Sequence, residues 1–175
     1  MTAEEYLRNH WVAKQVWRRL EVPLHQERLR RCAEAVAGGS TFIDVGCALG
    51  HSTAILKKFC PGNLTGFDND VVIEEARRLF PGIEFIHSIL DGAQWDGVVC
   101  SEVIEHVEDD ADWVRTLWRI TGKKLVVTTP AIPVKDPGHM RLYTEESLRA
   151  LFAFIPGAAI TRRGRFWFVT AQKGE

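Results

Sequence analysis

From residue 41 onward, short apolar runs alternate with amphipathic stretches. The apolar runs predict buried strands over 41–45, 64–68, 83–87, 96–100 and 125–128. The stretches between them predict helices over 52–59, 71–79, 109–121 and 144–153. This alternation is typical of an α/β fold with a mostly parallel sheet and helices on both faces. Two last apolar runs, 158–163 and 165–172, predict a C-terminal hairpin.

The chain before residue 40 has a different pattern. Apolar residues at helical spacing predict helices from about residue 3 to residue 37, and Pro23 divides them. The stripe formed by Trp11 and Trp17 favours packing against the sheet, and a lid over a site is the alternative. We therefore expect an N-terminal helical cap over 1–39 and an α/β region over 40–175, within a single domain overall.

Composition and charge limit the classes of binding partner that the protein is expected to have. The formal net charge of -1 disfavours a nucleic-acid partner but leaves it open. The four cysteines include no C-x-x-C pair, so we expect reduced thiols in a cytoplasmic protein. No apolar run approaches the ~20 residues needed to cross a bilayer, so no membrane partner is expected. Nothing in the composition indicates an oligomeric state.

A glycine-rich turn joins the first predicted strand to the next helix. It spans 44–50 and reads Asp-Val-Gly-Cys-Ala-Leu-Gly. Such a turn lets a ligand approach bare backbone, but the third glycine is misplaced for the G-x-G-x-x-G of dinucleotide sites. Asp44 lies two residues before the first glycine, at the mouth of the turn. Its carboxylate disfavours a pyrophosphate and favours a ligand that carries an ammonium group.

A second carboxylate, Asp68, ends the second predicted strand. There it can accept both hydroxyls of a ribose and repel a 2'-phosphate. Asp68 could also be a simple turn residue before Asn69, but its position after the glycine turn favours the ribose role. S-adenosylmethionine has a free ribose, an ammonium group and no phosphate, so it is the predicted cofactor. Ile89 and Leu90 are candidates for an apolar slot around its adenine.

Residues 40–172 resemble the class I S-adenosylmethionine-dependent methyltransferases. Residues 44–50 are similar to their D-x-G-x-G-x-G motif, with Ala48 in place of the middle glycine. Residues 102–107 resemble the E-V-I-E-H-V run of the broad small-molecule branch, and 137–144 resemble that branch too. The resemblance implies a Rossmann-like seven-stranded sheet and methyl transfer to an oxygen or nitrogen of a small-molecule acceptor. It implies cofactor contacts at Asp44, Gly46, Cys47, Ala48, Gly50, Asp68, Asn69, Ser88, Ile89, Ser101 and Glu102.

A carboxylate–histidine cluster leaves alternatives open. Glu102, Glu105 and His106 would share one face of a helical turn, and with His139 they could hold a divalent metal. Small-RNA 3'-end 2'-O-methyltransferases have a similar E-x-x-E-H run, a later histidine and a T-T-P like that at 128–130. A metal-dependent RNA 3'-end 2'-O-methyltransferase is therefore one alternative. A non-catalytic cofactor-binding module is another.

The broad methyltransferase branch carries the same run without a metal. We therefore assign no metal, and we expect His106 and His139 to be the candidate general bases, since imidazole titrates near neutral pH. The acceptor should enter where the turn at 102–106, the long loop at 129–143 and the N-terminal helices converge. These patterns identify the methyl donor and leave the acceptor unnamed.

Overall fold

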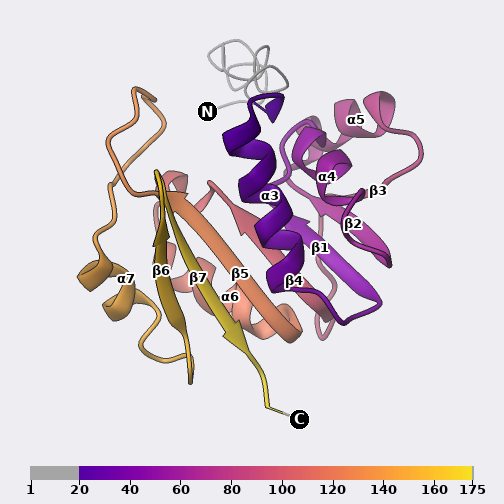
Figure 1. The fold of residues 1–175 in the computed structure, drawn as a ribbon. Coiled ribbons are helices and arrows are strands. Elements are labelled where there is room, and N and C mark those ends of the chain that lie inside the picture. The colour runs from indigo at the N-terminus through magenta and orange to yellow at the C-terminus, as the bar shows by residue number, and fades with distance from the viewer. Residues whose placement is uncertain (1–19, 175) are drawn as a thin grey trace.

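Figure 1 shows the computed structural model, which describes residues 20–174. The strands are β1 (Thr41–Val45), β2 (Asn63–Phe67), β3 (Glu84–Ile86), β4 (Trp95–Ser101), β5 (Thr121–Pro130), β6 (Ala159–Arg163) and β7 (Phe166–Gln172). The helices are α3 (Pro23–Ala35), α4 (His51–Leu56), α5 (Asp70–Leu79), α6 (Asp110–Ile120) and α7 (Glu145–Leu151), with a 3-10 turn, η1 (Ile104–His106). Every strand and helix expected after residue 40 is present, with shifted ends.

The strands form one seven-stranded sheet in the order β3-β2-β1-β4-β5-β7-β6. The pairs among β1 to β5 are parallel, and β7 is antiparallel to both β5 and β6. This arrangement confirms the predicted α/β fold and its C-terminal antiparallel hairpin. It also brings the carboxyl ends of β1, β2, β4 and β5 to one edge of the sheet, where ligands bind in open α/β folds.

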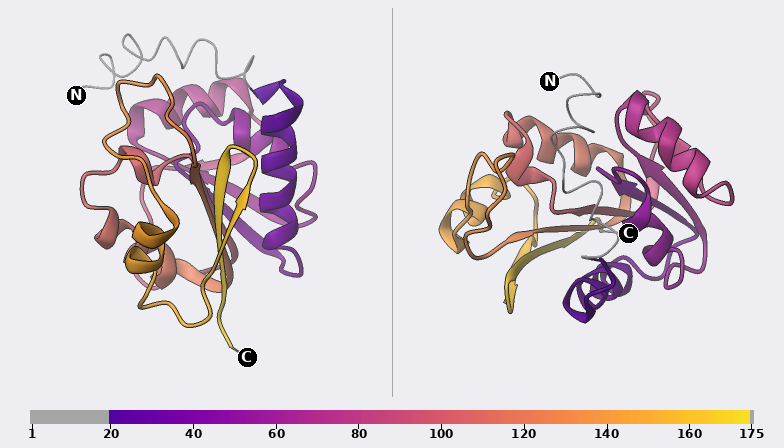
Figure 2. Two further views of the ribbon diagram at one scale, coloured as in Figure 1. Left: turned by 60° about the vertical axis from the view of Figure 1, so that its left-hand side comes forward. Right: turned by 90° about the horizontal axis from the view of Figure 1, so that it is seen from above.

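Successive residues of β1 pack into two different cores, because side chains alternate between the faces of a strand. Phe42 is fully buried with Leu29 of α3 and Leu56 of α4. Ile43 is buried on the other face with Leu117 of α6. Figure 2, in its view from above, places α3 and α6 on opposite sides of the sheet. The same alternation carries Asp44 to the face of α3 and α4.

Polar side chains set where several helices begin. Asn69 accepts a hydrogen bond from the Val72 amide and starts α5, and Asp109 accepts one from the Asp112 amide and starts α6. Thr144 accepts from the Ser147 amide at 3.2 Å and starts α7. Because Asn69 follows β2 directly, its cap holds the chain beside Asp68 at the ligand-binding edge.

Part of the predicted N-terminal cap, including Trp11 and Trp17, lies outside the described residues. Its second helix is α3, which begins with Pro23 in the first turn, where the missing amide hydrogen costs nothing. The division into a cap over 1–39 and a domain over 40–175 stays a prediction. Over residues 20–174, no helix is both long and apolar enough to cross a bilayer.

Candidate active site

A cavity of about 1010 Å³ lies at the carboxyl ends of the parallel strands. This volume lies at the upper end of the roughly 300–1,000 Å³ that is usual for small-molecule sites. The sequence-predicted residues that line it are Gly46, Cys47, Ala48, Asp68, Asn69, Ser101, Glu102, His106 and His139. The sequence-predicted residues outside its lining are Asp44, Gly50, Ser88 and Ile89.

The turn after β1 has a backbone that most residues avoid. Gly46 and Gly50 have φ angles of 83° and 81°, and Ala48 has a φ of 46° in the same left-handed region. A Cβ atom on Gly46 would lie 2.4 Å from Cγ2 of Val103, so the cavity wall itself requires glycine there. Ala48 therefore keeps the conformation that a glycine would adopt at the middle of the motif.

Asp44 lies behind this turn and not at its mouth. Its side chain is buried, and Oδ2 accepts hydrogen bonds from Ser52 Oγ at 3.0 Å and Thr53 Oγ1 at 2.8 Å. Burial raises the pKa of Asp44 to about 6, against the lowering effect of these two hydroxyls. The sequence analysis placed Asp44 at the mouth of the turn, and its burial corrects that position. Ser52, which the sequence analysis missed, lines the cavity and donates to Asp44.

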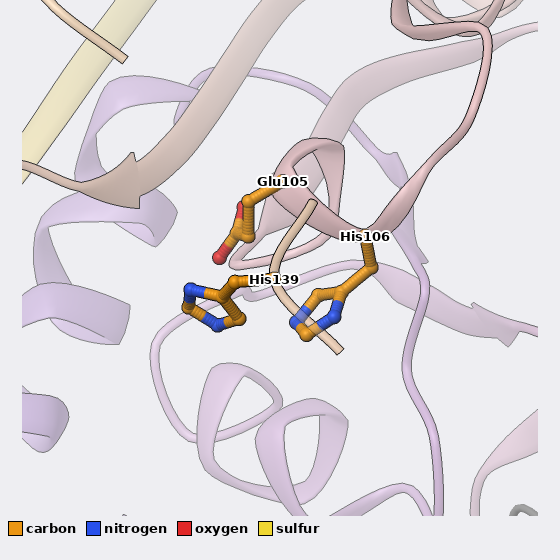
Figure 3. Close-up of side chains that lie close together, drawn as sticks. All are labelled: Glu105, His106 and His139. Atoms are coloured by element: carbon orange, nitrogen blue, oxygen red, sulfur yellow. The ribbon is translucent and has the colours of Figure 1, made fainter. Parts of the chain in front are cut away.

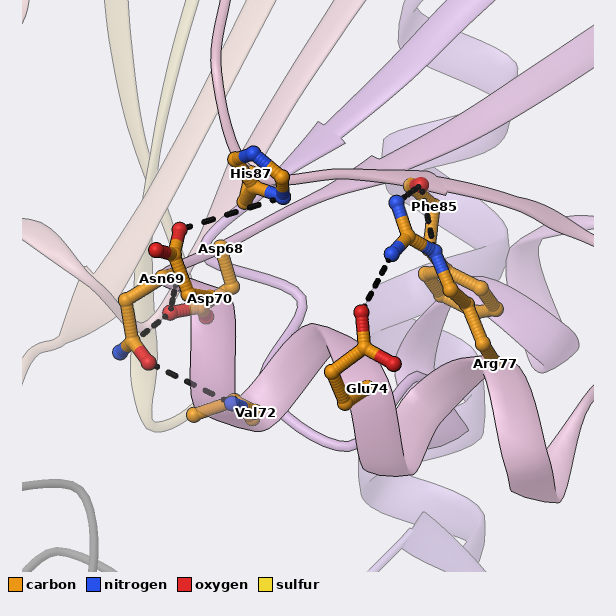
Figure 4. Close-up of polar contacts among 8 residues, drawn as sticks. All are labelled: Asp68, Asn69, Asp70, Val72, Glu74, Arg77, Phe85 and His87. Atoms are coloured by element: carbon orange, nitrogen blue, oxygen red, sulfur yellow. Dashed lines mark hydrogen bonds and ion pairs between the residues drawn. The ribbon is translucent and has the colours of Figure 1, made fainter.

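Asp68 and its neighbours form the wall after β2 (Figure 4). Oδ2 of Asp68 accepts from the Ala48 amide at 2.8 Å, which ties this carboxylate to the glycine turn. Oδ1 accepts from the amide and side chain of Asn69 at 2.8 and 3.1 Å. Burial raises the pKa of Asp68 from its ordinary value. Backbone amides that follow β1 and β2 thus hold the Asp68 carboxylate at the cavity surface.

The wall after β3 differs from the expected adenine slot. The cavity reaches His87, whose Nδ1 lies 3.9 Å from Oδ1 of Asp70, but its lining does not include Ser88 or Ile89. Leu90 is 78% exposed, so it does not form an apolar wall with Ile89 in this conformation.

Glu102 follows β4 and has a φ of 61°, which is rare for a residue with a side chain. Its Oε1 accepts from Thr128 Oγ1 at 3.2 Å, and its Oε2 pairs with Nη1 of Arg28 at 3.0 Å. The left-handed backbone places Glu102 before η1, outside the helical turn that the sequence predicts for it. Glu102 is therefore paired with Arg28 and does not belong to the group of ligands that the metal alternative required. The sequence carries no signal for Arg28, one of several arginines on α3.

The other three members of the cluster do meet (Figure 3). Ligand atoms of Glu105, His106 and His139 lie within 4.8 Å of one another. Glu105 is completely buried, and its Oε2 accepts from Thr129 Oγ1 at 3.0 Å. Its Oε1 is buried without a hydrogen-bond partner among the described residues. Burial, together with the charge of Glu102, raises the pKa of Glu105.

The two histidines present imidazole rings to the cavity. The rings of His106 and His139 have centroids 4.6 Å apart and are nearly perpendicular, at 88°. Nδ1 of His106 lies 3.0 Å from the Gly138 carbonyl oxygen. Because a carbonyl only accepts, the neutral ring carries its hydrogen on Nδ1 and its lone pair on Nε2. His139 Nε2 is 4.0 Å from Oδ2 of Asp136. This arrangement suits proton transfer.

Fold and site together define a class I S-adenosylmethionine-dependent methyltransferase. A family model described as "Methyltransferase domain" matches residues 16–155, and the chain belongs to that family. The predicted class of enzyme and the predicted cofactor are thereby confirmed. A search of curated proteins finds no match.

Solved structures with the same fold support this assignment. One is an S-adenosylmethionine-dependent methyltransferase from Aquifex aeolicus, with a TM-score of 0.69 and 15% identity over 90% of this chain and 97% of that chain. Magnesium protoporphyrin IX methyltransferase from Synechocystis PCC 6803, with bound SAH, has a TM-score of 0.67 and 16% identity over 98% of this chain and 100% of its own. Mitomycin 7-O-methyltransferase MmcR has a TM-score of 0.65 and 18% identity over 90% of this chain and 60% of its own.

Proposed function

We propose that this protein transfers the methyl group of S-adenosylmethionine to a hydroxyl oxygen of a small-molecule acceptor. One observation carries the proposal: two histidines line the same cavity as the glycine turn and Asp68. Neighbours of this fold include mitomycin and magnesium protoporphyrin methyltransferases, which act on small molecules. An amine acceptor needs only deprotonation and desolvation, whereas a hydroxyl benefits from a base, and the histidines supply one.

The donor would occupy the part of the cavity between β1 and β2. We assign the ribose hydroxyls to Asp68, whose carboxylate is already oriented by the Ala48 and Asn69 amides. The methionine moiety would lie against the backbone of Gly46 and Ala48, where Ser52 presents the hydroxyl that Asp44 orients. This placement directs the sulfonium toward Ser101 and Glu102, at the end of β4.

Methyl transfer is an in-line displacement. As the acceptor oxygen forms its bond to the methyl carbon, the carbon–sulfur bond breaks and S-adenosylhomocysteine leaves. The acceptor proton passes to an imidazole nitrogen, and we assign that role to Nε2 of His106 or to His139. Because the sulfonium is already activated, alignment of the three reacting atoms supplies most of the acceleration, with roughly 7–11 kcal/mol available from proximity and orientation.

Transfer of a labelled methyl group to a panel of phenols, alcohols and amines tests the proposal. His106→Asn and His139→Asn should each lower kcat for hydroxyl acceptors by about 100-fold where that histidine is the base, with unchanged affinity for S-adenosylhomocysteine. Amine acceptors should be much less affected. If both variants keep full kcat on every hydroxyl acceptor, the histidine assignment is wrong.

A second candidate rests on the buried Oε1 of Glu105, which has no partner among the described residues. Glu105, His106 and His139 offer one carboxylate and two imidazoles, a donor set that suits a divalent transition metal, and the orphaned oxygen lacks the partner that a cation would provide. A bound metal would lower the pKa of a coordinated hydroxyl. This candidate corresponds to the metal-dependent RNA-end methyltransferase that the E-x-x-E-H run resembles. Against it, Glu102 pairs with Arg28.

Thermal shift with Mg²⁺, Mn²⁺ and Zn²⁺ separates the two candidates. A metal site predicts a shift that Glu105→Gln abolishes and that Glu108→Gln, the exposed acid three residues on, leaves intact. It also predicts activity that is lost on chelation and restored by the metal. Unchanged melting and activity with and without metal would remove this second candidate.

A further inference from the structure

The cavity has two halves on opposite sides of β4. The sheet order places β1 and β2 on one side of β4, and β5 and β7 on the other. The half beside β1 and β2 is the donor half of the proposed function. The other half is lined by α3, the loop after β5 and the start of β7, and we call it the acceptor half. The residues of the acceptor half used below are Leu24, Arg28, Val134, Lys135, Arg165 and Phe166.

The acceptor half has an apolar surface that is open to a ligand. Leu24 is 40% exposed and Val134 is 37% exposed, although both line the cavity. Phe166 of β7 lines the same cavity and pairs in register with Pro130 of β5. Apolar walls of this kind bind an apolar ligand body through burial of its surface.

Two cationic side chains of the acceptor half, Lys135 and Arg165, have no carboxylate paired with them among the described residues. Within residues 20–174, neither Lys135 nor Arg165 forms an ion pair, because no carboxylate oxygen there lies within 4.0 Å of their side-chain nitrogens. Asp136, the nearest acid in sequence to Lys135, also lines the cavity, where it accepts from the Gly138 amide at 2.9 Å and lies beside His139. Within that part of the chain, two positive charges therefore face the cavity without a paired acid.

Arg28 adds an unsatisfied donor to the same wall. Its side chain is 6% exposed, and its guanidinium lies 4.8 Å from the centroid of the Phe166 ring. Nη1 is paired with Glu102, but Nε is buried and has no hydrogen-bond partner in the described chain. An unpaired buried donor is costly, and an oxygen of a bound ligand would satisfy it.

The turn of the C-terminal hairpin holds Arg165 beside the loop that follows β5. The Ala131 amide donates to the Arg165 carbonyl at 2.8 Å, which joins the hairpin to the loop that carries Val134 and Lys135. Both cations are thus attached to elements that are tied to each other. Arg163, on the same hairpin, is exposed and is not part of the cavity lining, so its charge has no such role.

We propose that the acceptor is an apolar molecule with one anionic group, a carboxylate or a phosphate, held by Lys135 and Arg165. This inference rests on the proposed function. The anion would bind at the mouth, the apolar body would lie along Leu24, Val134 and Phe166, and the reacting hydroxyl would point to the histidines. A cationic acceptor would meet two like charges at the same mouth.

Isothermal titration of the protein saturated with S-adenosylhomocysteine tests the inference. The probes are hydroxynaphthoic acid, its uncharged methyl ester and naphthyl phosphate. We expect the better of the two anions to bind about tenfold more tightly than the ester, because charge-assisted hydrogen bonds are worth that much. The double variant Lys135→Ala/Arg165→Ala should bring the ratio close to one, whereas Arg163→Ala should keep it.

The outcomes separate this inference from the proposed function. If S-adenosylhomocysteine does not bind, the proposed function fails. If it binds but neither anion is preferred over the ester, or if the preference survives the double variant, only the present inference is overturned. The order of naphthyl phosphate and the acid shows which anion the two cations bind more tightly, and only tighter binding of the acid, against the larger charge of the phosphate, identifies the anion as a carboxylate.

Discussion

Replacing Asp44 by asparagine should stabilise the cofactor-free protein at neutral pH. The asparagine side chain keeps an oxygen to accept from Ser52 and Thr53, but it carries no charge into the interior. Burial raises the pKa of Asp44 from 3.8 to about 6 in the folded protein. A shift of that size corresponds to about 3 kcal/mol of folding free energy, as an order of magnitude.

The sign of this effect follows from proton binding. The folded state holds the Asp44 proton more tightly than the unfolded chain does. The contribution of the Asp44 carboxyl group to wild-type stability is therefore fully present below pH 3.8. That stability is lost as the pH rises through about 6. The amide that replaces the carboxyl group in the variant cannot titrate. The stability of Asp44→Asn relative to wild type should therefore increase from pH 4 to pH 7.

Urea denaturation at pH 4 and pH 7, without cofactor, measures this change. The comparison between the two pH values cancels any constant effect of the amide group. Asp96→Asn is the matched control, because the Ser40 amide at 2.7 Å and Lys123 at 2.9 Å hold the pKa of Asp96 below its ordinary value. That variant should differ from wild type by a nearly constant free energy of unfolding between pH 4 and pH 7, because the stability that ionised Asp96 contributes is already present above about pH 3.8. A difference between Asp44→Asn and wild type that does not change with pH would refute the burial argument.

The remaining predictions concern packing around the same cavity. Gly46→Ala should destabilise the fold by about 2–4 kcal/mol in urea denaturation, because the new Cβ collides with Val103 and left-handed backbone disfavours a side chain. Adding Val103→Ala should recover part of that loss, and a strictly additive double variant would contradict the collision. Arg28→Met should cost about 1–3 kcal/mol by leaving the partly buried Glu102 without its cation, and adding Glu102→Gln should restore most of it. An Arg28→Met protein that melts like wild type would show that the ion pair is dispensable.

Local patterns predicted the fold because each helix or strand is indicated by the apolar and polar pattern of a few consecutive residues. The apolar run before Gly46, which forms β1, is an example. The burial of the Asp44 side chain could also have been predicted from the sequence. Asp44 lies two residues after Phe42 on a strand, so it shares the buried face of Phe42 and not the open mouth of the turn.

The pairing of Arg28 with Glu102 could not be predicted in that way. These residues come from segments far apart in the sequence, and the left-handed backbone at Glu102 removes it from the face that helical spacing assigns. The exposure of Leu90 is likewise decided by the path of a loop that has no periodic pattern. The cofactor contacts, the catalytic histidines and the cytoplasmic location stay predictions.

Calorimetric titration with S-adenosylhomocysteine tests the central claim most directly, namely that Asp68 anchors the ribose of the methyl donor. The wild-type protein should bind one molecule per chain. Asp68→Asn should bind at least about tenfold more weakly, because it loses charge-assisted hydrogen bonds. Asp91→Asn, which changes an exposed aspartate outside the cavity lining, should bind like wild type. Absence of binding by the wild-type protein, or equal binding by Asp68→Asn, would contradict the account.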